Sequence, residues 1–306
     1  PNNLGKMGEK PTHPELLDYL AIYFIDHGWS VKEMHRAIML TAAYRRSSKP
    51  ASGNRLDTAD PENKLLSYFP PRRLEAEELR DTILSVSGEL SEDAGGPGTF
   101  PDINEGVANQ PQQIMGTLMP AYRASPTRRE RNRRTIYTFQ KRNLTNPFVD
   151  VFNGPSLDES TDRRLASTVP TQVFALFNGE FTHNMALAFA ARIEKLGNNA
   201  DGKIDAAFES AVNRLPTDPE RARVRKFLLQ MTDYHRHTAP PPVREQKPVI
   251  RGITSELTGT EVMIEEDRDS AAHEANLHAR EVSPETRAMA ELALALFNLN
   301  EFVYVY

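Results

Sequence analysis

The feature that most constrains the fold is a series of apolar stripes at helical spacing, each ending near a proline or a glycine. The first stripe follows Thr12, which has capping-box spacing to Glu15, and it ends at Gly28. Ser30 and Glu33 repeat the capping spacing and begin a second stripe. Comparable stripes predict helices over residues 60–69, 73–90, 171–177, 180–196, 203–214 and 218–235, and from Ser283 onward. The sequence therefore predicts a mainly α protein.

Long stretches with little periodicity separate these helices. Residues 91–125 contain a Gly-Gly-Pro-Gly run at 95–98 and further prolines, which together predict a long loop. The apolar residues Ile136, Tyr137 and Phe139 predict a short strand near 134–141. Three prolines at 240–242 begin a segment that we expect to be an irregular arm or linker over 238–282. We expect a single irregular helical domain over 1–306, with a small β element, long loops and an extended apolar tail from Phe302.

Composition and charge argue against several classes of protein. The net charge is −5, so bulk electrostatics give no reason to expect a nucleic-acid partner. No apolar run approaches the roughly 18 residues that a membrane helix needs. The chain has no cysteine, which excludes disulfides, thiolate metal sites and a covalent c-type haem within it. Because the chain begins at Pro1 and not at Met, we expect a piece of a longer protein whose targeting signals lie upstream.

Residues 133–180 combine the most varied chemistry in the sequence. An acidic cluster of Asp150, Asp158, Glu159 and Asp162 lies beside two arginines, Arg163 and Arg164. Hard cations such as calcium take several oxygen ligands, but the spacing is not that of an EF-hand loop, and the two arginines would repel a cation. We therefore interpret the cluster as carboxylate–arginine hydrogen bonds that fix a turn, with no metal. The arginines of residues 123–134 are expected to pair with this acidic loop or with solvent.

The histidine patterns do not make a complete metal motif. His273-Glu274 followed by His278 resembles a zinc-protease helix, but the histidines are five residues apart instead of four. On a helix they would point in different directions, which favours a solvated helix face. His235 and His237 could chelate a metal if extended, yet the neighbouring prolines favour an exposed loop without a third ligand. Residues 95–98 lack the Lys-Ser/Thr of a phosphate loop, and no Gly-x-Ser-x-Gly elbow is present.

A family resemblance rests on several short runs in a fixed order. The longest is GEKPTHPELLD at residues 8–18. The others are AAYR at 42–45, DPENKLL at 60–66, RRLEAE at 72–77, LRD at 79–81, GGP at 95–97, RTIY at 134–137, RLAST at 164–168 and NLNEFVYV at 298–305. Over residues 3–306 the chain resembles the planctomycete-specific domain of unknown function numbered fifteen fifty-three.

The resemblance implies an extracytoplasmic protein, periplasmic or at the cell surface, of which this chain is the C-terminal part. It also implies upstream c-type cytochrome domains, so a haem is expected on an upstream domain and no cofactor in this chain. It implies no activity, because the family has none established. Where the family often has Ser-Cys, this chain has Ser160-Thr161-Asp162, and residues 238–282 match no part of the family.

Three hypotheses of function remain open. The first is a noncatalytic binding or assembly module that contacts other domains of the same polypeptide or a surface complex, through a polar surface of Arg134, Asp158, Glu159 and Arg163. The second is a hydrolase of extracellular polysaccharide that uses Asp158, Glu159 and His13 as acid and base. The third is a domain stabilised by a metal. The candidate binding residues are His13, Arg134, Asp158, Glu159, Arg163 and Arg164.

Overall fold

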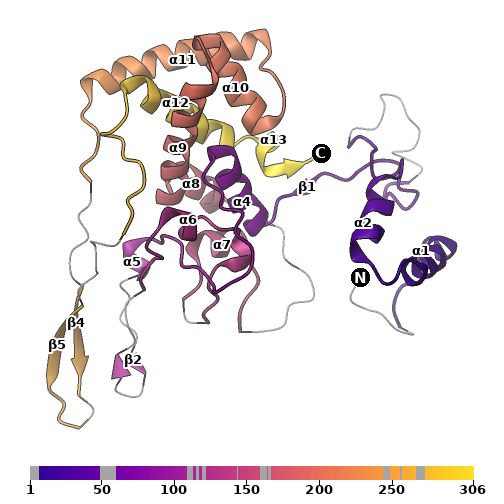
Figure 1. Ribbon diagram of the computed structural model, residues 1–306, viewed down its shortest axis with the longest axis horizontal. Coiled ribbons are helices and arrows are strands. Elements are labelled where there is room, and N and C mark those ends of the chain that lie inside the picture. The colour runs from indigo at the N-terminus through magenta and orange to yellow at the C-terminus, as the bar shows by residue number, and fades with distance from the viewer. Residues whose placement is uncertain are drawn as a thin grey trace. The chain divides into compact units, whose positions relative to one another are not determined.

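The computed structural model describes residues 7–48, 60–108, 113–114, 117–118, 122–142, 144–158, 164, 167–243, 249–255, 257–266 and 273–306. The chain divides into two compact units, Pro1–Arg73 with Tyr304–Tyr306, and Leu74–Val303. The fold is mainly helical, as the apolar stripes predict (Figure 1). The single-domain organisation over 1–306 stays a prediction. None of the described helices has the length and hydropathy that a membrane span requires.

The first unit begins with two helices, α1 (Pro14–Asp26) and α2 (Val31–Met39). The chain turns between them through Gly28 and Trp29, both at positive φ. The predicted cap of α2 is confirmed, because the Ser30 hydroxyl accepts from the Glu33 backbone N–H. The capping box predicted for α1 is wrong, because its N-cap residue is His13 and no side chain caps it. Neither helix contains a buried residue.

The helix predicted over residues 60–69 is wrong, because this stretch is a series of turns. The Asp60 carboxylate accepts from the backbone N–H groups of Lys64 and Leu65 at 2.8 and 2.7 Å. Asn63 and Leu66 have φ of 50° and 52°, which a right-handed helix does not allow. The stretch leads to strand β1 (Arg72–Arg73), which pairs antiparallel with β6 (Tyr304–Val305). The C-terminal tail is therefore extended from Tyr304, as predicted, although Phe302 lies in a final short helix.

The core of the second unit lies among α4 (Ala76–Ser87), α9 (Glu180–Leu196) and α12 (Pro284–Phe297), with the short helix α13 (Asn300–Val303) beside it. Helix α9 packs against both α4 and α12 (Figure 1). Phe189 of α9 and Phe297 of α12 are fully buried, with their ring centroids 5.9 Å apart. Three further predicted helices surround this core: α8 (Pro170–Asn178), α10 (Ala200–Val212) and α11 (Asp218–His237).

Between α4 and α8 the chain forms loops with short elements, as the low periodicity predicts. These are α5 (Glu105–Ala108), β2 (Gln113–Ile114), β3 (Thr117–Leu118), α6 (Arg128–Arg131), the 3-10 helix η1 (Thr135–Tyr137) and α7 (Pro147–Val151). The strand predicted near 134–141 is wrong, because η1 occupies its first half. The Asp81 carboxylate accepts from both the backbone N–H and the hydroxyl of Thr135, at 2.7 and 2.6 Å, and so fixes the start of η1 on α4.

Residues 238–282, predicted as irregular, contain a β-hairpin. Strand β4 (Val249–Thr254) pairs antiparallel with β5 (Glu261–Glu266), from Val249 opposite Glu266 to Thr254 opposite Glu261. Gly259, at a φ of 68°, lies in the connecting turn. The prolines at 240–242 therefore mark the end of α11 but do not keep the whole segment irregular.

Candidate functional site around Asp102

A buried arginine of α4 connects this helix to the loop that carries α6 and η1. Arg80 is 2% exposed. Its Nη1 donates to the Arg133 carbonyl and to the Thr135 hydroxyl, each at 3.1 Å, and its Nη2 donates to the Arg131 carbonyl at 2.9 Å. Burial lowers the pKa of this guanidinium to about 10, and the charge of Asp81 opposes the shift. Arg80 is therefore charged at neutral pH and holds residues 131–135 on the helix.

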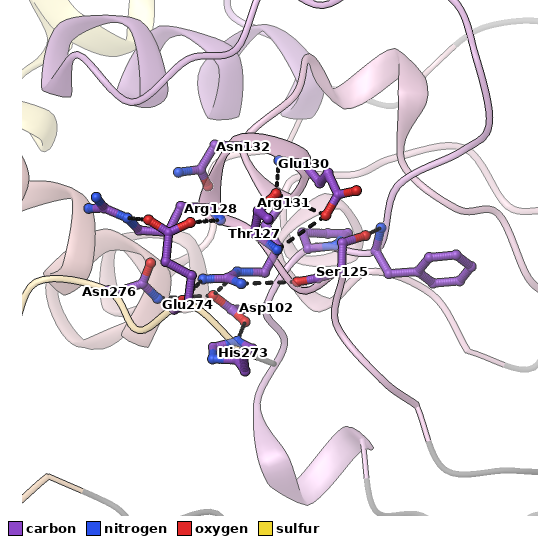
Figure 2. Close-up of polar contacts among 12 residues, drawn as sticks. Asp102, Ser125, Thr127, Arg128, Glu130, Arg131, Asn132, His273, Glu274 and Asn276 are labelled. Carbon is purple, nitrogen blue, oxygen red and sulfur yellow. Dashed lines mark hydrogen bonds and ion pairs between the residues drawn. The ribbon is translucent and has the colours of Figure 1, made fainter. Parts of the chain in front are cut away.

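Arg131, the last residue of α6, is the centre of a second set of polar contacts (Figure 2). Its Nη1 donates to the carbonyls of Ser125 and Pro126 at 2.9 and 2.8 Å, and its Nη2 donates to the carbonyl of Glu274. Its Nε lies 3.0 Å from Oδ2 of Asp102. Because the Arg131 side chain is fully buried, this carboxylate supplies the opposite charge that a buried cation requires.

The Asp102 carboxylate joins segments that lie far apart in the sequence (Figure 2). Nε2 of His273 lies 3.1 Å from Oδ1, and Nδ2 of Asn276 donates to Oδ2 at 2.9 Å. Burial acts to raise the pKa of Asp102, but the hydrogen bonds from His273 and Asn276 and the charge of Arg131 together hold it below its ordinary value. The carboxylate is therefore ionised at neutral pH and orients the His273 imidazole.

The segment 273–276 is fixed on the α6 loop by Glu274 as well as by Asp102. The backbone N–H of Arg128 donates to Oε2 of Glu274 at 2.8 Å, and its Nε donates to Oε1 at 2.9 Å. The Glu274 backbone N–H in turn donates to the Pro126 carbonyl at 2.8 Å. The two hydrogen bonds from Arg128 lower the pKa of Glu274. Residues 273–276 thus bind this loop through both backbone and side-chain contacts.

A small cavity lies beside Asp102. Its volume is ≈ 10 Å³, about the space that one water molecule needs. Its polar lining comes from Arg80, Asp102, Asn132, Asn184 and Asn276, and its apolar lining includes Phe181. Pockets for small-molecule ligands are roughly 300–1,000 Å³. The cavity therefore suits an ordered water among polar groups better than a substrate.

Two of the predicted binding residues, Arg134 and Arg164, form ion pairs with carboxylates of α4. Nη1 and Nη2 of Arg164 donate to Glu77 at 2.5 and 2.9 Å, and Nη1 lies 3.0 Å from Glu75. Nε of Arg134 lies 3.6 Å from Asp81. Burial acts to raise the pKa of Glu77, but the hydrogen bond from Arg164 turns the net shift downward. Because Glu77 and Asp81 are four residues apart, both ion pairs lie on one face of α4.

The described contacts of the other predicted binding residues are local. His13 belongs to the first unit, where its Nδ1 lies 3.0 Å from the Thr12 hydroxyl. Asp158 is exposed, and its backbone N–H donates to the Ser156 hydroxyl at 3.2 Å. Glu159 and Arg163 lie outside the described residues. The polar surface of Arg134, Asp158, Glu159 and Arg163 stays a prediction.

The histidine patterns adopt other structures than those predicted. His273 and His278 belong to a segment without helix, and the ring of His273 contacts Asp102, so the solvated helix face is wrong. His235 and His237 lie in the last turn of α11 and not in a loop. Within the parts of the chain that the structure describes, no group of three or more histidine or carboxylate side chains could hold a metal ion.

The central residues of this site differ in how readily they can be identified from the sequence alone. Arg80 lies within the buried stripe of α4, made by Ala76, Leu79, Arg80, Ile83, Leu84 and Ser87. A charged residue in an apolar stripe is a readable sign of a buried polar contact. Asp102 and His273 are separated by 171 positions, and no spacing rule links residues that far apart.

Comparison with curated proteins and with solved structures finds no match. A family match covers residues 1–228 and therefore ends within α11. The closing run at 298–305, which contributes to the resemblance, lies beyond it. Because the match covers most of the chain, the chain belongs to the family PSD1, proteins of unknown function (DUF1553).

Proposed function

We propose that this chain is a noncatalytic binding or assembly module. The observation that carries the proposal is the apolar surface of α1. The most exposed of its large apolar side chains are Leu17, Tyr19, Ile22 and Ile25, and Trp29 in the following turn is 66% exposed. At 100° per residue these side chains point in several directions around the helix. Apolar side chains that are spread so widely around a helix are ordinarily covered by neighbouring elements, yet within the first unit α1 contains no buried residue.

The partner that fits this surface is another protein domain. Contiguous exposed apolar patches mark protein or membrane contacts, and aromatic residues are enriched in the centres of protein interfaces. Tyr19 and Tyr23 have ring centroids 6.1 Å apart, and Phe24 and Trp29 have centroids 5.3 Å apart. These contacts hold several rings in place before binding, so less side-chain entropy is lost when a partner docks.

The partner is a neighbouring domain of the same polypeptide or a member of a surface complex, outside the cytoplasm. This part of the proposal is supported by the family resemblance, from which we also expect a c-type haem on an upstream domain. Cell fractionation of the host and haem staining of the full-length polypeptide test it. A cytoplasmic full-length protein without haem would contradict both the location and the neighbour.

Binding between this chain and the upstream domains, purified as separate proteins, tests the assembly role. We expect a complex by isothermal titration calorimetry. The double substitution Tyr19→Ser with Ile22→Ser should weaken it more than about tenfold, because both side chains leave the contact. Lys32→Ala in α2 is the control and should change the affinity less than about twofold. No complex, or equal affinity for the two variants, would contradict the proposal.

A second candidate function, polysaccharide hydrolysis, is favoured by the contact between Asp102 and His273. A carboxylate that orients an imidazole is the arrangement of a general base. In this candidate function the carboxylate is Asp102, and the catalytic roles of Asp158 and Glu159 stay predictions. Release of reducing ends from a panel of anionic and neutral polysaccharides tests it. Activity that is lost in His273→Gln, with unchanged thermal stability, would support hydrolysis over the assembly role.

A further inference from the structure

The β4–β5 hairpin has the properties of a docking element. Among the described residues each of its strands pairs only with the other. An isolated two-stranded hairpin is marginally stable in water, and its outer edges carry unpaired backbone groups that can accept another strand. Apolar side chains are also exposed on it, with Ile250, Val262 and Met263 all more than half exposed.

The register shows which backbone groups face outward on β5. The Ser255 backbone N–H donates to the Thr260 carbonyl at 2.9 Å, and these two residues continue the pairing of Thr254 with Glu261. In an antiparallel pair, inward and outward N–H groups alternate along each strand. The N–H groups of Glu261, Met263 and Glu265 therefore point away from β4, toward the free edge.

The same three residues of β5 share one face of the hairpin, because side chains alternate along a strand. Gly252 of β4 lies opposite Met263, and a Cβ atom at Gly252 would clash with the Glu261 carboxylate and lie 3.3 Å from Sδ of Met263. The glycine thus leaves room for these two side chains on its face. That face of β5 presents acidic, apolar and acidic side chains at Glu261, Met263 and Glu265.

We infer, building on the proposed assembly role, that the free edge of β5 binds an extended segment of a partner protein whose side chains read basic-x-apolar-x-basic. The added strand would accept from the outward N–H groups of β5, as in recognition by strand addition. Its two basic residues would lie across from Glu261 and Glu265, and its apolar residue would lie across from Met263. Opposite charges in directly facing positions stabilise a strand pair, and like charges destabilise it.

Fluorescence anisotropy with labelled peptides on the full chain tests this at low salt. The probe is the acetylated, amidated peptide Lys-Thr-Val-Thr-Lys, and the control probe is Glu-Thr-Val-Thr-Glu. We expect the lysine peptide to bind at least about tenfold more tightly than the glutamate peptide. No binding of the lysine peptide at millimolar concentration, or equal binding of both, would overturn the inference.

Two proline substitutions separate the two edges of the hairpin. Met263→Pro removes an outward N–H from β5, whereas Ile250→Pro removes an outward N–H from β4, because Ile250 lies opposite Glu265 in the register. Neither removes a hydrogen bond between the two strands. We expect Met263→Pro to weaken binding of the lysine peptide about tenfold or more, and Ile250→Pro to leave this binding nearly unchanged. Equal effects of the two substitutions would show that the β5 edge is not the binding site.

Charge reversal avoids any dependence on how well the proline variants fold. Glu261→Lys with Glu265→Lys should invert the preference, so that the glutamate peptide binds more tightly than the lysine peptide. An unchanged preference would overturn the inference. The Tyr19→Ser and Ile22→Ser variant should bind both peptides as the unmodified chain does, so loss of the α1 interaction and loss of the β5 interaction are distinguishable.

Discussion

Helices α1 and α12 are of nearly equal length and both are rich in apolar residues, but they differ in what covers them. Helix α12 buries most of its apolar side chains among α9, α11 and α13, whereas α1 buries none. The same kind of sequence thus stabilises the second unit in one place and leaves apolar surface uncovered within the first unit in the other. Apolar content alone therefore does not show whether a helix serves folding or association.

The largest effect on stability is expected in the core of the second unit, where α12 and α1 can be compared directly. Phe297 is fully buried, with its ring centroid 5.0 Å from that of Phe302. Phe297→Ala should lower the free energy of unfolding by about 3–5 kcal/mol, because it leaves a cavity. The matched substitution in α1 is Ile22→Ala, whose side chain is 59% exposed and whose effect should stay below about 0.5 kcal/mol. Urea denaturation followed by circular dichroism compares the two, and similar effects would contradict the contrast.

A somewhat smaller effect on stability is expected at Arg80, which connects α4 to the loop that carries α6 and η1. Arg80→Met should lower the free energy of unfolding by about 3 kcal/mol, because the carbonyls of Arg131 and Arg133 lose a buried donor. The control is Arg134→Met. The Arg134 side chain is 61% exposed, and its Nε lies 3.6 Å from Asp81, which is too far for a hydrogen bond. Its effect should be below about 1 kcal/mol. If both variants have the same urea midpoint, Arg80 does not hold the loop.

An intermediate and pH-dependent effect is expected at Asp102. Asp102→Asn should cost about 1–2 kcal/mol at pH 7, because Arg131 loses its opposite charge. The folded-state pKa of Asp102 is depressed, so its stabilisation is fully present above the unfolded pKa near 4 and is lost as the pH falls through the lower folded value. The difference in Tm between the two proteins should therefore shrink below about pH 4. The exposed Asp158→Asn variant should show no such convergence, and a constant difference for Asp102→Asn would contradict the ion pair.

The smallest effect on stability is expected for an ion pair at the surface of α4. Arg164 is about one-third exposed, and its ion pair with Glu77 is screened by solvent. Arg164→Gln should change the free energy of unfolding by less than about 1 kcal/mol, and the change should fall further in high salt. Thermal melts at two salt concentrations measure it. A loss as large as that of Arg80→Met would place Arg164 among the structural arginines.

The sequence predicts helices well where packing follows local periodicity. Helices α8 to α11 begin and end close to the predicted residues, and α12 begins where predicted, because the residues that cap and end them are local. Helices α8, α9, α10 and α12 also bury apolar residues of their stripes. The prediction fails where side chains override the backbone pattern. Hydrogen bonds to the Asp60 carboxylate stabilise the turns of residues 60–69, and hydrogen bonds to the Asp81 carboxylate stabilise the 3-10 helix of residues 135–137. Both are carboxylates that accept backbone N–H groups, which periodicity does not reveal.

The candidate site is less predictable than the fold, because its members come from distant segments. Arg134 and Arg164 lie in a mixed polar stretch, yet their acidic partners lie earlier in the sequence, in α4. The contact between Asp102 and His273 depends on the path of the chain after the β4–β5 hairpin. A charge pattern along the sequence cannot select among so many possible partners, whereas the folded chain brings one of them within reach.

The family match ends at residue 228, but the second unit continues to Val303 and packs helices from beyond that residue into its core. A polypeptide cut there would keep α9 and lose α12, together with the aromatic cluster of Phe297 and Phe302. Phe189 and its neighbours would then face water, and such a fragment should be insoluble. Recombinant work on relatives should set the end of the gene fragment by the last buried helix and not by the limits of sequence similarity.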